Sequence, residues 1–225
     1  MIVDFDCMDV QTSDNETIFF EILSRFTKRS SNQKLDTQKT ILNFEKSGEI
    51  INYDFFLLQS LKKSLPNSQT SRNIKYSVNI SAKTLKKADE IANLTADIAQ
   101  FLIFEITETS DVDINEAFYF TQKMRFLGAE IAVDDINHSK QGLDLVFSLH
   151  PEYAKFVLPK NSNEYDSFFR LISKTVTFSP SSDIVVENIE TAEEFALVSQ
   201  MIPFALLQGY YFNTGETFIQ GLRYN

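Results

Sequence analysis

The sequence predicts an α/β barrel, and two observations lead to this fold class. First, strand-like and helix-like segments alternate along the chain with short links, as expected for parallel strands joined by helical crossovers. Second, this alternation repeats roughly seven or eight times, and a sheet of that many units closes naturally into a barrel. No low-complexity tract, repeat or Pro/Gly-rich linker divides the chain, so we expect residues 1–225 to form a single domain.

The expected strands are apolar, β-branched or aromatic runs. They cover residues 1–10, 17–26, 75–81, 101–108, 129–135, 153–158, 183–190 and 204–212. The expected helices cover residues 37–47, 54–65, 115–127, 143–149, 165–178 and 191–201, with another inside 82–100. Gly48 and Pro66 end the first two helices, and Thr191 with Glu194 has the spacing of a capping box. We expect a loop at residues 27–36 and a helical tail.

The composition limits the classes of function. Thirty-one acidic and 21 basic residues give a net charge of -10, which argues against a surface that binds long nucleic acids. Cys7 is the only cysteine, so no intrachain disulfide forms and a reducing compartment is expected. The first residues include acids and no apolar core, unlike a signal peptide, and no apolar run approaches the ~18 residues of a membrane span. We therefore expect a cytoplasmic protein.

Two adjacent carboxylates end the most clearly buried strand. Ile131, Ala132 and Val133 form a short apolar run, and Asp134 and Asp135 follow it directly. Repulsion between like charges makes such a pair costly unless cations neutralise it. A solvated turn is the alternative interpretation, and for an isolated Asp-Asp pair it is the commoner one.

Other expected strands also carry isolated polar residues inside apolar runs, namely Glu21, Arg25, Asn79, Glu105, Lys155 and Glu187. Buried acids paired with Lys or Arg also stabilise barrels, so each residue alone has two interpretations. Together, at the carboxyl ends of barrel strands, Glu21, Asn79, Glu105, Asp134, Asp135 and Glu187 would surround one mouth. Because all six offer hard oxygen ligands, we expect one or two Mg²⁺ or Mn²⁺ ions rather than zinc. Such ions suit hydrolysis at phosphorus.

Several strand ends also match the motifs of one protein family. Residues 21–25 read Glu-Ile-Leu-Ser-Arg, and further matches follow in order at residues 45–50, 78–81, 104–108, 133–135, 153–155, 186–191 and 207–210. In these motifs the chain resembles the EAL domain family of cyclic di-GMP phosphodiesterases. The resemblance implies a modified TIM-like (β/α)8 barrel and a role in bacterial second-messenger signalling.

The resemblance also implies a role for each matching residue. One ion would be held by Glu21, Asn79, Glu105 and Asp134, and a second by Asp134, Asp135 and Glu187. The implied catalytic residues are Glu187, which is also the general-base candidate in single-metal mechanisms, and Lys155, which would orient the attacking water or offset charge. Arg25 would hold a substrate phosphate, Gln208 would contact the ligand or a water, and Glu108 and Glu190 would brace the ligands. The implied reaction converts cyclic di-GMP to linear pGpG.

Four departures from the family pattern lead to an alternative hypothesis. Residues 136–142 lack the family's glycines, so that positive φ angles become harder to reach, and residues 155–157 lack an acid. Asn188 replaces a glycine, and the usual Gln-Pro-Ile start is missing. The alternative is a catalytically silent EAL module that regulates by binding cyclic di-GMP or a protein. The resemblance also allows a homodimer, although the altered loop is the one that supports it in the family.

Overall fold

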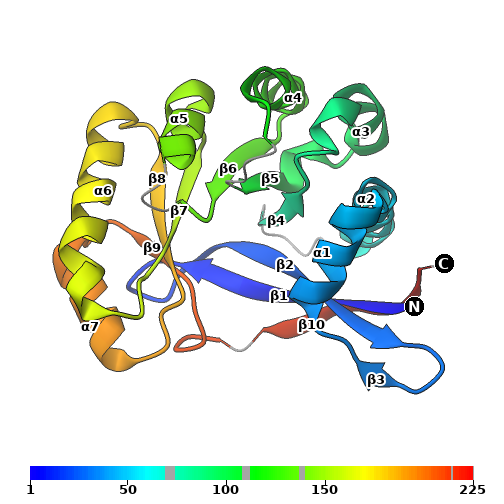
Figure 1. The fold of residues 1–225 in the computed structure, drawn as a ribbon, viewed down its shortest axis with the longest axis horizontal. Helices are drawn as coiled ribbons and strands as arrows, with labels where there is room; N and C mark the ends of the chain where they lie inside the picture. The colour runs from blue at the N-terminus through cyan, green and yellow to red at the C-terminus, as the bar shows by residue number, and fades with distance from the viewer. Residues whose placement is uncertain (69–73, 108–111, 137–139, 214, 225) are drawn as a thin grey trace.

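The computed structural model describes residues 1–68, 74–107, 112–136, 140–213 and 215–224. It confirms the predicted barrel, a closed sheet of eight strands with helices packed around its outside (Figure 1). The barrel strands are β1 (Ile2–Gln11), β2 (Thr17–Lys28), β4 (Lys75–Ile80), β5 (Leu102–Thr107), β6 (Glu130–Asp134), β7 (Tyr153–Val157), β8 (Asp183–Glu187) and β9 (Leu206–Leu207).

The direction of β1 distinguishes this barrel from a fully parallel one. β1 runs antiparallel to both of its neighbours in the barrel, β2 and β9, whereas β2 and the strands from β4 to β9 are parallel to one another. The pairing of β1 with β2 closes the barrel. The carboxyl ends of the parallel strands therefore meet at one mouth, as the sequence predicted.

The helices connect the parallel strands. They are α1 (Thr37–Ser47), α2 (Ile50–Ser68), α3 (Ala88–Thr95), α4 (Ile114–Phe126), α5 (Lys140–Leu149), α6 (Tyr165–Phe178) and α7 (Ala192–Met201), with short 3₁₀ turns η1 (Leu85–Lys87), η2 (Ala99–Phe101) and η3 (Ser162–Glu164). Two predicted helix ends are confirmed. Gly48 ends α1 with a φ of 80°, and the capping box of Thr191 and Glu194 begins α7.

Two hydrophobic clusters separate the inside of the barrel from its outside. The interior cluster fills the lower part of the barrel and consists of Val10, Phe19, Ile103, Ala132, Tyr153, Val185 and Leu206. The larger cluster lies between the strands and the helices, where Phe104 and Phe120 pack edge to face at 5.3 Å. The interior cluster forms a floor, and the side chains above it face the mouth.

The carboxyl-terminal segment differs from our expectation of a helix. It forms β10 (Glu216–Arg223), which pairs antiparallel with β1. β1 contacts β9 only at Gln11, so most of that edge of β1 would otherwise present unpaired backbone groups. β10 pairs with these backbone groups of β1, and its side chains Phe218, Ile219 and Leu222 pack against the outer cluster.

Three other segments depart from the predicted boundaries. α2 begins at Ile50 instead of Asp54, because its buried stripe of Ile50, Tyr53 and Leu57 continues the helical period in the amino-terminal direction, and it extends to Ser68, past Pro66. The predicted loop at 27–36 contains a short strand, β3 (Gln33–Lys34), which pairs with the end of β2. The last barrel strand, β9, contains Leu206–Leu207, whereas we expected a strand over residues 204–212.

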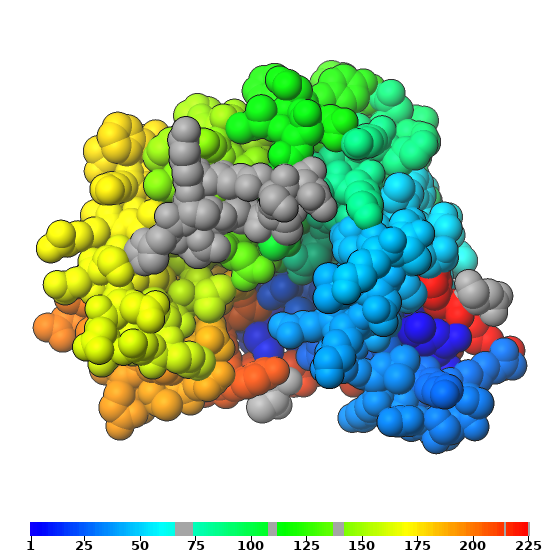
Figure 2. Space-filling view, in the orientation of Figure 1, coloured from blue at the N-terminus to red at the C-terminus, as the bar shows by residue number. Residues whose placement is uncertain are grey.

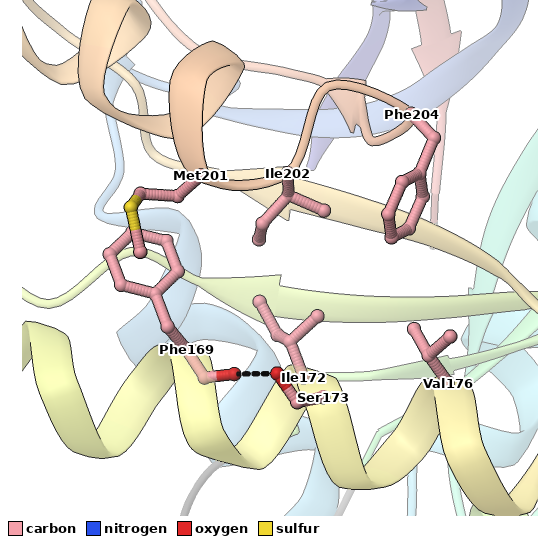
Figure 3. Close-up of a pocket in the computed structure, with 7 residues that line it drawn as sticks. All are labelled: Phe169, Ile172, Ser173, Val176, Met201, Ile202 and Phe204. Atoms are coloured by element: carbon pink, nitrogen blue, oxygen red, sulfur yellow. Dashed lines mark hydrogen bonds between the residues drawn. The ribbon is translucent and has the colours of Figure 1, made fainter.

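An apolar pocket of about 290 Å³ lies outside the barrel, between α6 and the end of α7 (Figure 3). Its lining residues are Phe169, Ile172, Ser173, Val176, Met201, Ile202 and Phe204. None of them faces the mouth. Among the described residues, no helix combines the length and apolar character that crossing a membrane requires.

Candidate functional site

A layer of polar side chains lies directly above the apolar floor of the barrel. Its members are Glu21, Glu105, Asp134, Lys155, Glu187 and Gln208, and each follows a floor residue by two positions. Since side chains in a strand alternate between faces, these residues point to the same side as the floor residues. Asn79 joins them from β4, opposite Glu105 in the parallel register. Figure 2 shows helices around a hollow, with β1 in dark blue at its bottom.

Lys155 lies at the centre of this layer and is fully buried. Its Nζ donates to both carboxylate oxygens of Glu105 at 2.8 Å and lies 2.8 Å from Oε1 of Glu187. Oδ1 of Asp134 is 3.3 Å away and Oε2 of Glu21 is 3.7 Å away. One ammonium group therefore serves four carboxylates, and Asp135 adds a fifth acid beside them.

This surplus of negative charge shifts the pKa values of the buried groups. Burial, together with repulsion from Glu21 and Asp134, raises the pKa of Glu105 to about 8, although Lys155 opposes the shift. Burial and the neighbouring carboxylates also raise the pKa of Glu187 well above its usual value. Burial alone would lower the pKa of Lys155, but the four carboxylates around it raise that pKa. The layer thus favours an additional positive charge, either a proton or a cation.

Glu21 connects the neighbouring amides to this cluster. Gln208 donates from Nε2 to Oε2 of Glu21 at 2.6 Å, and Asn79 donates from Nδ2 to Oε1 at 3.3 Å. Thr107, two residues after Glu105, donates to Oδ1 of Asn79 at 3.5 Å. The sequence placed Thr107 on the same strand face as Glu105, but we did not predict it as a site residue.

The acids after β6 and β8 fit a divalent cation. One oxygen from each of Asp134, Asp135 and Glu187 lies within 4.8 Å of the others, the spacing of ligands around a single ion. Oε1 of Gln208 is buried and accepts no hydrogen bond from the described residues, and Oδ1 of Asp134 is buried with an ion pair to Lys155 at 3.3 Å but no hydrogen bond of good geometry among them. Oxygen donors of this kind, beside a layer in which one ammonium group faces four carboxylates, suit Mg²⁺ or Mn²⁺.

The remaining predicted residues lie around the mouth. Arg25 is on the same face of β2 as Glu21, and its Nε is 2.9 Å from Asp6 of β1, a partner that we did not predict. Glu190 is exposed and pairs with Lys160 at 2.9 Å, so it does not contact the buried layer directly. Glu108 lies outside the described residues, as do positions 137–139 of the loop after Asp135.

The loops after β8 and β9 cross in close contact. Gln208 accepts a backbone hydrogen bond from Ile189 at 3.1 Å, and Tyr211 donates to the carbonyl of Ile189 at 3.0 Å. A Cβ on Gly209, whose φ is 155°, would lie 2.1 Å from the Ile189 carbonyl oxygen. Only glycine fits this crossing, which fixes Gln208 beside the loop that follows Glu187.

Comparison with known proteins places the chain in a family. The sequence matches the EAL domain over residues 8–214. The chain belongs to the EAL domain family. No curated protein matches the sequence.

Solved structures with the same fold include EAL domains of known ligand state. The PaMucR phosphodiesterase in complex with c-di-GMP is 17% identical with a TM-score of 0.81, covering 96% of this chain and 97% of that one. The FimX EAL domain from Pseudomonas aeruginosa bound to c-di-GMP is 18% identical with a TM-score of 0.79, covering 99% and 93%. A Vibrio cholerae LapD S helix-GGDEF-EAL structure is 17% identical with a TM-score of 0.79, and the match spans 95% of this chain and 54% of that one. At these identities the likeness shows the fold alone.

Two residues at or after the strand ends adopt the left-handed backbone that glycine would allow. Asn188 replaces the motif glycine after Glu187 and adopts a φ of 65°. Asp135 has a φ of 55°, although the residues after it lack the family's glycines. Asn and Asp enter this left-handed region more readily than other residues with a side chain. Asn188 therefore keeps the left-handed backbone that the motif glycine would allow.

Proposed function

We propose that this chain is a metal-dependent phosphodiesterase that hydrolyses cyclic di-GMP to linear pGpG in the cytoplasm. The observation that carries the proposal is the meeting of Asp134, Asp135 and Glu187 within 4.8 Å, beside a buried layer with four carboxylates and one lysine. Membership of the EAL domain family and the c-di-GMP complexes of its structural neighbours support the choice of substrate.

The proposed ligands divide into two groups that share one residue. Glu21, Asn79, Glu105 and Asp134 would hold one ion, and Asp134, Asp135 and Glu187 would hold a second. When bound, such ions lower the pKa of a coordinated water and stabilise charge on the phosphate oxygens.

The remaining roles concern protons, charge and the orientation of the substrate. In a single-metal mechanism Glu187, at the end of β8, would be free of the second ion and would accept the proton of the attacking water. Lys155 is fully buried between Glu105 and Glu187, which supports charge compensation more than contact with substrate. Arg25 is about a third exposed on the face of β2 that carries Glu21, where it would hold a phosphate, and Gln208 would orient Glu21 or a water.

A turnover assay tests the proposal. Purified protein, cyclic di-GMP and Mn²⁺ or Mg²⁺ should yield pGpG, separated by chromatography. Glu21→Ala and Glu187→Gln should each lower the rate by at least about 100-fold, because each removes a ligand or the base. Glu152→Gln is the matched control, since this acid lies at the opposite end of the barrel and pairs with Arg125 at 3.0 Å. Absence of product from folded wild-type protein with either metal would reject the enzyme hypothesis.

A receptor or protein-binding regulator is the second candidate, and one observation favours it. Both oxygens of Glu105 and one oxygen of Glu187 already bond to Lys155, so part of the cluster is neutralised by the protein itself. Tight binding of cyclic di-GMP without turnover would identify a receptor. If the protein neither binds nor hydrolyses cyclic di-GMP, regulation through a protein contact is the hypothesis that remains.

A further inference from the structure

Helix α2 carries a buried carboxylate that faces the end of a barrel strand. Asp54 is only 3% exposed, and Tyr53, Leu57 and Leu58 of the same helix are buried as well. An ionised group in such surroundings loses hydration, and the loss is tolerated only where the group is hydrogen-bonded. Asp54 therefore needs specific partners, and they lie outside its own helix.

The partners of Asp54 belong to the turn that follows β4. Oδ2 of Asp54 accepts the backbone N–H of Ser81 at 3.1 Å and the hydroxyl of Thr84 at 2.6 Å. The same turn is closed internally, since Thr84 donates its N–H to the Ser81 carbonyl at 2.9 Å and Lys83 donates to the Ser81 hydroxyl at 3.2 Å. One carboxylate on α2 thus joins both ends of residues 81–84.

Ser81, whose backbone N–H Asp54 accepts, lies two residues after Asn79, a proposed metal ligand. Asn79 is exposed at the mouth, and its side-chain contacts there are long, 3.3 Å to Glu21 and 3.5 Å from Thr107. Bonds of this length constrain a side chain weakly. Ser81, in contrast, is tied by its backbone to a buried group. The position of Asn79 therefore depends more on where β4 ends than on its neighbours in the mouth.

We propose that Asp54 is a positioning residue of the candidate metal site, which sets the direction of the Asn79 side chain by fixing the turn after β4. The proposal rests on the proposed function only for the identity of Asn79 as a ligand. The position of Asn79 itself is a property of the metal-free protein. Acidic groups that orient a ligand from outside the coordination sphere are common at metal sites.

The charge state of Asp54 is consistent with this role. Burial raises its pKa to about 7, while the bonds from Thr84 and Ser81 lower it and Glu45 raises it. Both partners are donors, so they suit the ionised form. An asparagine keeps one acceptor oxygen for Ser81 and offers its amide hydrogens to the Thr84 oxygen, so Asp54→Asn should preserve the turn. Alanine removes both bonds.

The experiment compares Asp54→Ala and Asp54→Asn with the control Glu152→Gln. We expect calorimetry to show Mn²⁺ affinity about tenfold weaker in Asp54→Ala and within about twofold of wild type in Asp54→Asn and Glu152→Gln. In metal-free protein, the side-chain amide resonances of Asn79 should shift or broaden in Asp54→Ala only. Thermal unfolding of all four proteins identifies any loss of stability, and the control shows whether such a loss alone weakens Mn²⁺ binding.

The outcomes separate this proposal from the proposed function. Unchanged Mn²⁺ affinity in a folded Asp54→Ala protein would overturn it and leave Asp54 a purely structural residue. The proposal would also be overturned if Glu152→Gln, at a stability similar to that of Asp54→Ala, lost the same Mn²⁺ affinity. If the wild type binds no Mn²⁺, the proposed function fails, and the Asn79 resonances then decide: an unchanged signal in Asp54→Ala overturns the positioning role, and a changed signal supports it. Should the alanine variant not fold, Thr84→Val, which removes one of the two bonds, takes its place with the same criteria.

Discussion

The two ends of the barrel differ in how their acidic side chains are paired with cations. At the amino ends of the strands, two partly buried acids have cations of their own: Lys75 pairs with Glu130, and Arg125 contacts both oxygens of Glu152 at 3.0 Å. Glu152 also accepts the backbone N–H of Ile131 at 2.8 Å. At the carboxyl ends, Lys155 alone serves four carboxylates.

This difference shows what each end contributes. Paired charges with satisfied hydrogen bonds hold neighbouring elements together and leave no need for a ligand. A surplus of carboxylates costs stability, because the protein must keep like charges close together, and an added cation relieves that cost. In barrels of this architecture, the carboxyl ends of the strands carry function and the amino ends carry stability. The following changes test the contrast.

The largest effect is expected from Lys155→Met, which removes the one ammonium group that the described residues place in the carboxylate layer. Breaking a buried ion pair in this way costs about 3–5 kcal/mol. We therefore expect a loss of that size in urea unfolding at pH 7 without metal, with partial recovery when Mn²⁺ is added or when the pH is lowered so that the carboxylates are protonated. A variant as stable as wild type at pH 7 would show that the layer does not need this charge.

A smaller effect is expected from the pH dependence of Asp54. Its carboxyl has a pKa of about 7 in the folded protein and an ordinary value of 3.8, so the folded state holds the proton more tightly. The contribution of this group to stability is therefore complete below about pH 3.8 and is lost as the pH rises to about 7, with an upper limit of about 4 kcal/mol. The unfolding free energy of wild type minus that of Asp54→Asn, measured across this range, should fall with pH. A flat difference would contradict the raised pKa.

The smallest effect is expected at the amino ends of the strands. Glu152→Gln keeps one acceptor for Ile131 but loses its charge on Arg125, so we expect a loss of about 1–2 kcal/mol. Added Mn²⁺ should not restore this loss beyond the stabilisation that it gives to wild type, which thermal unfolding with and without the metal would measure. If Mn²⁺ restored the lost stability of Glu152→Gln beyond its effect on wild type, the proposed difference between the two ends of the barrel would be contradicted.

Much of this arrangement was predictable from the sequence. Alternation with a period of two places Glu105 above Ile103 and Asp134 above Ala132, so one rule assembles most of the polar layer. The layer also explains why isolated acids interrupt apolar runs. The roles of its members as metal ligands stay predictions.

Other features were not predictable because they depend on partners distant in sequence. The tail forms a strand because β1 offers an open edge, which local propensity does not reveal. Asp54 is buried because the turn after β4 supplies two donors, and nothing in its own helix indicates this. The position of Lys155 between Glu105 and Glu187 likewise follows from packing across the barrel, since sequence pattern gives faces and not distances.

The crossing of Gly209 and Ile189 has a consequence for motion at the mouth. Backbone hydrogen bonds join the two loops on both sides of the crossing, and no space separates them. A displacement of the loop after β8 must therefore carry the segment after β9 with it. Any shift of Glu187 would then be accompanied by a shift of Gln208, so the two side chains keep their relative positions on this side of the mouth.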